Sequence, residues 1–170
     1  TAASLHGVAH QAPQVFQVAV DRHVRNRTVG RTRFEFAQRE VDHVAVVAHA
    51  TQSGSAWLST VETTVLDLAT DVARGGGIDN VATVLIELAE LDAFQPADLA
   101  RLAARFPASA GRRVGYVLEH FAGREDLEPL REVVRDAAGS PSRLDPTGSP
   151  AGSVDRGWML YLNRDVEPDV

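Results

Sequence analysis

The pattern of hydrophobic and polar positions changes about one third of the way along the chain. In the first part, apolar side chains alternate with polar ones and valine and phenylalanine are frequent, which predicts strands at 15–20, 32–37 and 43–49. From residue 60 the apolar positions recur at helical spacing. The first such stripe ends at the glycines 75–77 and consists of Val61, Val65, Leu68, Ala69 and Val72.

Four further helices are predicted after this stripe. One begins at Asp79, and the next has Pro96 in its first turn, where proline is tolerated, and ends at Pro107. The last two helices follow the apolar positions of 110–123 and 127–139. The chain therefore changes from a β-rich part to a helical part.

The C-terminal part has a different composition. Residues 139–157 are rich in glycine, proline and serine and show no period, which predicts a loop. Residues 158–163 alternate well enough to form a strand that returns to the N-terminal sheet. The expected fold is α+β. We expect a small, mostly antiparallel sheet, made of N-terminal strands and a C-terminal strand, that packs with about five helices. The whole chain, 1–170, is expected to form one domain. Its β-rich part is 1–58 and its helical part is 59–138.

Composition narrows the class of protein. The chain has 170 residues, 44% of them hydrophobic, which is enough for one core. It has no cysteine, which excludes disulfides and thiolate metal sites. No apolar run approaches the roughly eighteen residues of a membrane-spanning helix. These features are typical of a cytoplasmic protein.

Candidate catalytic and metal-binding residues have simpler interpretations. Ser59 and Glu62 have the spacing of a helix-capping box, while Asp67 falls on the polar side of the same helix, so the two acids do not converge as a general acid and base. His6 and His10 are four residues apart, but no third ligand follows nearby. We therefore expect no enzyme activity, no cofactor and no metal.

A run of arginines is the best local signal for binding. Residues 22–34 contain no acid and carry +5 in a chain of net charge −6, which leaves −11 for the remainder. Such a hairpin could contact nucleic-acid phosphates, or it could be a solvated hairpin whose arginines pair with acidic helices. No aromatic residue alternates with the arginines, so a platform for stacking single-stranded bases is not expected. The run consists of Arg22, Arg25, Arg27, Arg31 and Arg33.

Five sequence blocks, in order, resemble the AbiEi family of antitoxins from type IV toxin–antitoxin systems. The first, TAASLHGVAHQAPQVFQVAV, is similar to the segment in which an alanine-rich helix leads into LHGL and a β region, and it contains Leu5, His6 and Gly7. The second, STVETTVLDLA, is similar to S-x-x-E-[RK]-T-[LV]-[LV]-D-L, with Thr63 in place of the usual basic residue. Its matching positions are Ser59, Glu62, Thr64, Asp67 and Leu68.

The remaining blocks extend the resemblance over nearly the whole chain. RGGGIDNVATVLIEL and FQPADLARLAARF form the third block. The fourth, ASAGRRVGYVLEHFA, is similar to R-[LV]-G-[YF]-L-L through Arg113, Gly115, Tyr116 and Leu118. The fifth, RLDPTGSPAGSVDRGWMLYLN, resembles the family's closing loop and strand through Leu144, Asp145, Pro146, Trp158 and Asn163.

The resemblance implies a non-enzymatic antitoxin and transcriptional regulator of an abortive-infection, phage-defence system. Members counter a nucleotidyltransferase toxin of the AbiEii kind and repress their own operon through a DNA-binding winged helix. No winged-helix region is seen ahead of Thr1, so the resemblance implies the C-terminal antitoxin domain. The implied partners are operator DNA and the toxin, and no membrane. Two alternatives remain: a nucleic-acid-binding module acting through the arginine run, and a small hydrolase or nucleotidyltransferase using Glu62 and Asp67.

Overall fold

The computed structural model divides into two compact units, Thr1–Thr60 and Val61–Val170, here called the strand unit and the helical unit. The boundary falls between the last strand of the β-rich part and the first long helix. Each unit is described by itself below. The structure describes residues 2–8, 15–38, 45–51, 54–137, 139–149 and 151–169.

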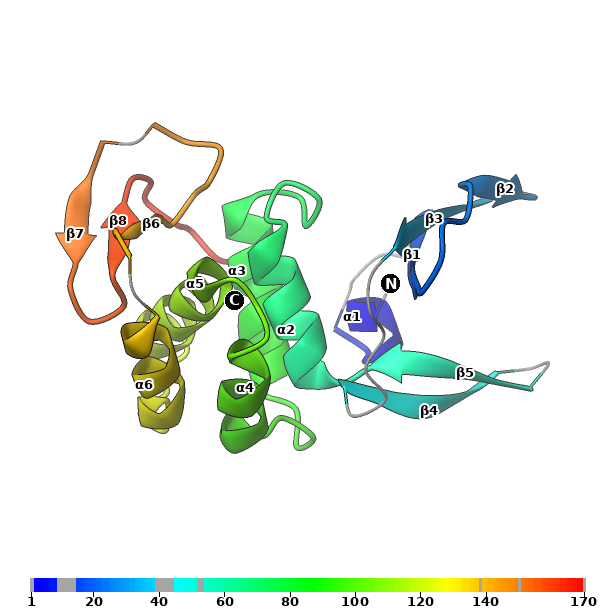
Figure 1. Ribbon diagram of the computed structural model, residues 1–170, viewed down its shortest axis with the longest axis horizontal. Coiled ribbons are helices and arrows are strands. Elements are labelled where there is room, and N and C mark those ends of the chain that lie inside the picture. The colour runs from blue at the N-terminus through cyan, green and yellow to red at the C-terminus, as the bar shows by residue number, and fades with distance from the viewer. Residues whose placement is uncertain are drawn as a thin grey trace. The chain divides into compact units, whose positions relative to one another are not determined.

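The strand unit contains a short helix and two small sheets (Figure 1). One sheet has the strand order β1-β3-β2, in which β1 and β3 are parallel and β2 and β3 antiparallel. The other is the antiparallel β4–β5 hairpin. The elements are α1 (Ala2–Leu5), β1 (Val15–Val20), β2 (Arg27–Val29), β3 (Thr32–Gln38), β4 (Val46–Thr51) and β5 (Gly54–Ser59).

The alternating segments of the sequence do form strands here. β1 and β3 lie where they were predicted, and β4 covers most of the third predicted strand, of which residues 43 and 44 lie outside the described part. β2 and β5 were not predicted. Most of their residues are exposed and β5 begins with glycine and serine, so neither shows the alternation of a half-buried strand.

Within its described residues, the helical unit contains five helices and a third small sheet, and the α+β class is confirmed. No helix in the described part of the chain is long and apolar enough to cross a membrane. Proline lies in the first turn of α4, as predicted. The elements are α2 (Val61–Thr70), α3 (Ile78–Ala89), α4 (Pro96–Ala103), α5 (Ala108–His120), α6 (Glu128–Asp136), β6 (Ser142–Arg143), β7 (Ser153–Asp155) and β8 (Leu160–Leu162).

The C-terminal strand does not join the N-terminal sheet, in contrast to the prediction. β8 lies between β6, to which it is parallel, and β7, to which it is antiparallel. Because both of its edges are occupied, no edge remains for a strand of the other unit. The predicted loop of residues 139–157 therefore contains two strands, which are too short to show a period in the sequence.

The deepest core lies around α2. This helix packs against α3, α4 and α5, and Val65, Leu66 and Ala69 are fully buried. Leu118 of α5 is also fully buried, as the helical spacing predicted. Because α2 has neighbours on several sides, Thr63 is buried as well, and the polar face expected there is not a solvated surface.

Candidate functional site

A buried arginine on α5 organises the C-terminal segment. Its Nε donates hydrogen bonds to the carbonyl oxygens of Arg143 (3.0 Å) and Leu144 (3.1 Å), and its Nη1 donates to that of Ala69 (2.8 Å), near the end of α2. Burial lowers the pKa of this side chain, Arg113, to about 10, and the nearby carboxylate of Asp145 opposes that shift. Arg113 therefore stays charged at neutral pH and joins α2, α5 and the segment after α6.

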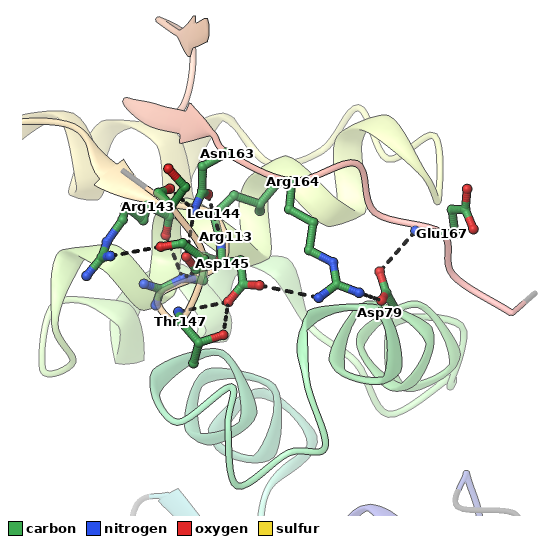
Figure 2. Close-up of polar contacts among 11 residues, drawn as sticks. Asp79, Arg113, Arg143, Leu144, Asp145, Thr147, Asn163, Arg164 and Glu167 are labelled. Atoms are coloured by element: carbon green, nitrogen blue, oxygen red, sulfur yellow. Dashed lines mark hydrogen bonds and ion pairs between the residues drawn. The ribbon is translucent and has the colours of Figure 1, made fainter. Parts of the chain in front are cut away.

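Asp145 is the acidic centre of the polar network in Figure 2. Its Oδ1 accepts hydrogen bonds from the amide (2.8 Å) and hydroxyl (2.6 Å) of Thr147, and its Oδ2 lies 3.5 Å from Nη1 of Arg164. Burial alone would raise the pKa of Asp145, but the bonds from Thr147 and the charge of Arg164 outweigh it and lower the pKa. The buried carboxylate is therefore stabilised in its charged form.

Asn163 closes the loop that follows Asp145. Its Oδ1 accepts from the amide of Asp145 (3.0 Å), and its Nδ2 donates to the carbonyls of Asp145 (2.8 Å) and Ser149 (2.8 Å). One side-chain amide thus satisfies three backbone groups, which otherwise would need partners in a loop without regular pairing. These contacts explain structurally why an aspartate and an asparagine occur at these positions.

The last residues lie along the start of α3. Arg164 pairs through Nη2 with Asp79, whose other oxygen accepts from the amide of Glu167 at 3.2 Å. The hydroxyl of Thr83 accepts from the amide of Asp169 at 2.9 Å. Asp79 is in the first turn of α3, where a negative charge is favoured by the helix dipole. Sequence reasoning did not identify Asp79 or Arg164, because their partners lie roughly half the chain away.

The indole of Trp158 is inserted between α5 and α6. A Cβ on Gly115 would lie 2.0 Å from the ring, so only glycine fits beneath it. The indole Nε1 donates to Oε2 of Glu119 at 2.6 Å, and the guanidinium of Arg131 lies 4.5 Å from the ring centroid while also pairing with Glu119. Burial would raise the pKa of Glu119, but the hydrogen bonds of Trp158 and Arg131 lower it. Gly115 and Trp158 thus form one packing unit.

Tyr116 lies on α5 beside two other rings. Its ring centroid is 4.4 Å from that of His120 and 6.2 Å from that of Phe121. Burial raises the pKa of the Tyr116 hydroxyl, and the negative charges of Asp155 and Asp165 add to this shift. The phenol is therefore neutral over the physiological range and serves as a packing group.

The two acids of α2 lie in different surroundings. Glu62 is buried, and its Oε1 accepts from the amide of Gln95 at 2.8 Å, at the residue preceding α4. Ser59 belongs to β5, and the contact of Glu62 with Gln95 is a long-range one that stabilises the start of another helix. The capping box with Ser59 stays a prediction. Thr64 is buried and Asp67 half-buried on the same helix.

The described residues of the first family block form a short helix and turn (2–8) and the strand β1. Leu5 ends α1, and Nε2 of His6 lies 2.8 Å from the carbonyl oxygen of Ser59. Gly7 has a φ of 91°, a conformation that favours glycine. His10, the other member of the possible metal pair, lies outside the described residues. Among those described, no group of three or more His, Cys, Asp or Glu side chains could hold a metal ion.

The arginine run extends from the segment before β2, through β2 and the β2–β3 turn, to the start of β3, and all five residues are exposed. Arg27 stands over the ring of Phe36, with its Cζ 5.4 Å from the centroid, and Arg33 pairs with Glu35 at 3.1 Å. Arg27 on β2 is paired in register with Phe34 on β3, so both side chains lie on the same face of the sheet. Arg33 is the neighbour of Phe34 along β3, so its side chain points to the opposite face. The structure therefore does not gather all five charges on one face.

Comparison with known protein families identifies the family of this chain. A family model described as the AbiEi antitoxin C-terminal domain matches residues 1–120. No curated protein and no solved structure matches the chain. The matched region includes Arg113 and Gly115 and ends at the last residue of α5, so the segment that these two residues hold lies beyond it.

Proposed function

The chain belongs to the AbiEi antitoxin C-terminal domain family and has an antitoxin role in a toxin–antitoxin system, and we propose that it counters a nucleotidyltransferase toxin of a type IV system in the cytoplasm. The match over residues 1–120 carries this proposal. Autorepression of the operon, as part of phage defence by abortive infection, belongs to the same proposal. Operator DNA is the partner that autorepression would require.

We further propose that this domain acts by binding and not by catalysis. The perturbed charged groups at the centre of the helical unit are already engaged within the molecule: Arg113 by backbone carbonyls, Asp145 by Thr147 and Arg164, and Glu119 by Trp158 and Arg131. A general acid or base needs a free path to a substrate proton. Groups that serve internal contacts support a structural role for the family motif.

A growth-rescue assay tests the antitoxin proposal. The toxin encoded next to this gene is expressed together with these 170 residues, or with the full-length gene. We expect both to restore growth, because the family match lies within the tested residues. Loss of rescue by both would overturn the proposal.

Two variants make the assay specific. Trp158→Ala should reduce rescue because it destabilises the helical unit. Arg101→Ala changes an exposed pair with Asp98 and should rescue like the natural chain. Equal rescue by Trp158→Ala, at equal protein levels, would mean that antitoxicity does not depend on the stability of the helical unit.

A second candidate function is contact with nucleic acid through the arginine run. The exposure of all five side chains supports it, because phosphate contacts require accessible guanidinium groups. Replacing Arg22, Arg25, Arg27, Arg31 and Arg33 together by alanine should weaken binding and make it less dependent on salt. Unchanged binding by that variant would remove this candidate.

A further inference from the structure

The β1-β3-β2 sheet brings three phenylalanines to one face. Phe16 is paired in register with Phe34, and residues directly opposite each other on neighbouring strands point to the same side. Phe36 lies two residues beyond Phe34 on β3 and therefore shares that face. In the sequence, the whole arginine run separates Phe16 from the other two rings. We expected no stacking platform because no aromatic residue lies between the arginines, and that pattern could not show that strand pairing brings the three rings to one face.

Two of the rings stack on each other, and a guanidinium group lies over the third. Phe16 and Phe34 are stacked, with centroids 5.7 Å apart and an interplanar angle of 29°. Arg27, which is in register with Phe34, covers the ring of Phe36. All three phenylalanines are only half-buried. Both aromatic rings and guanidinium planes stack on nucleic-acid bases.

The positive charges border the same sheet. The segment that carries Arg22 and Arg25 is attached to β3 at two places: Asn26 Oδ1 accepts from the amide of Phe36 (2.9 Å), and Gln38 Nε2 donates to the carbonyl of Asp21 (3.4 Å). These contacts hold the segment beside the half of β3 that carries the Phe36 ring. A flexible phosphate backbone can follow such a border while its bases reach the rings.

We propose that this face of the β1-β3-β2 sheet binds single-stranded nucleic acid, with bases stacked on its three phenylalanines and phosphates held by Arg22, Arg25, Arg27 and Arg31. The inference rests on the second candidate function and specifies its ligand. A single strand is favoured over a duplex because a duplex keeps its base faces stacked against each other, whereas sheet aromatics require unpaired bases. Arg33, on the opposite face and paired with Glu35, has no part in this site.

Fluorescence anisotropy of the 170-residue chain with labelled oligonucleotides of about 12 nucleotides tests the proposal. The probes are single-stranded RNA, single-stranded DNA and the corresponding DNA duplex. We expect either single strand, or both, to bind more tightly than the duplex, and the two single-stranded probes separate RNA from DNA as the source. Tighter duplex binding, or no binding to either single strand, would overturn the proposal.

A pair of substitutions at Phe36 tests stacking itself. Phe36→Leu should weaken single-strand binding roughly 5- to 100-fold, because leucine preserves an apolar contact but removes the ring. Phe36→Tyr keeps the ring and should bind like the natural chain. Circular dichroism and melting temperature confirm folding of both variants. Unchanged affinity of the leucine variant, or an equal loss in both, would contradict base stacking.

The salt dependence tests the arginines. Replacing Arg22, Arg25 and Arg27 by alanine should reduce the slope of log affinity against log salt by about 0.7 for each phosphate that is no longer neutralised. Arg33→Ala is the matched control and should leave the slope nearly unchanged. A slope that falls equally in the control would mean that the charges act without regard to the face of the sheet, which would overturn the inference.

The experiments also distinguish the proposals from one another. Duplex binding with a steep salt dependence would keep the second candidate function, contact through the arginine run, and would overturn the inference of single-strand binding. The growth-rescue assay is independent of both.

Discussion

The strand unit and the helical unit differ most in how deeply they bury apolar side chains. Among the described residues of the strand unit, only Val8 and Leu58 are buried hydrophobics, whereas the helical unit buries side chains from all of its helices. The two tryptophans illustrate the contrast: Trp158 in the helical unit is 0% exposed and Trp57 on β5 is 67% exposed. The helical unit is built for stability, and the strand unit presents more of its apolar surface.

The two units also differ in charge. Thr1–Thr60 contains six arginines and four acidic residues, a net charge of +2, while Val61–Val170 contains eleven arginines and nineteen acidic residues, a net charge of −8. A negatively charged ligand is therefore attracted to the first unit and repelled by the second. The contrast supports the strand unit as the part of the chain in which the proposed nucleic-acid binding takes place.

The matched tryptophans give the largest expected difference. Trp158→Ala should lower the free energy of unfolding by roughly 3–5 kcal/mol, because it empties a fully enclosed space against Gly115. Trp57→Ala should cost less than about 1 kcal/mol, as is usual for a largely exposed position. Urea unfolding followed by circular dichroism measures both. Similar losses for the two variants would contradict the division between the units.

Arg113→Met tests whether the C-terminal segment depends on one buried guanidinium. Methionine keeps most of the apolar volume but leaves three carbonyl bonds unmade. It also removes one of the two positive charges near Asp145, the other being that of Arg164. We expect a loss of roughly 3 kcal/mol in the free energy of unfolding. Hydrogen exchange should show early opening of residues 142–163. The matched control is Arg105→Met on an exposed arginine of the same unit, which should cost far less.

The pH dependence of stability should originate in the helical unit. The pKa values of Glu119 and Asp145 are lowered in the folded state, so their carboxylates stabilise the fold above the pH at which the unfolded groups titrate. This stabilisation is lost as the pH falls through the lowered folded-state pKa values, beginning below about pH 5. Urea midpoints measured against pH should decline there, and Glu119→Gln should make the decline shallower. An unaltered decline in that variant would remove Glu119 as a contributor.

The smallest effect is expected at an exposed position of the strand unit. Val29 on β2 is 62% exposed, and Val29→Ala should change the free energy of unfolding by no more than about 0.5 kcal/mol. Val65→Ala, at a fully buried position of α2, is the matched substitution and should cost more than about 1 kcal/mol. If chemical denaturation gave equal losses in the free energy of unfolding for the two variants, the side chain of Val29 on β2 would have to be covered in solution.

Much of the local structure could be predicted from the sequence. The helical stripes, Pro96 at the start of α4 and the alternation in β1 and β3 are short-range patterns, which depend on the period of each element and on the fixed φ of proline. The arginine run and its exposure were also predictable. β2, β5, β6 and β7 were missed because short or exposed strands have no buried face to impose a pattern.

The sequence by itself determined the fold class, the helices and the order of the family blocks, because these depend on neighbouring residues. Only the tertiary structure decided the partners: Glu62 stabilises the start of α4, β8 lies between β6 and β7, and Trp158 covers Gly115. Only it placed Phe16 beside Phe34. The reason is physical: a periodic pattern specifies which face of an element is buried, but packing and pairing between distant segments select what that face contacts.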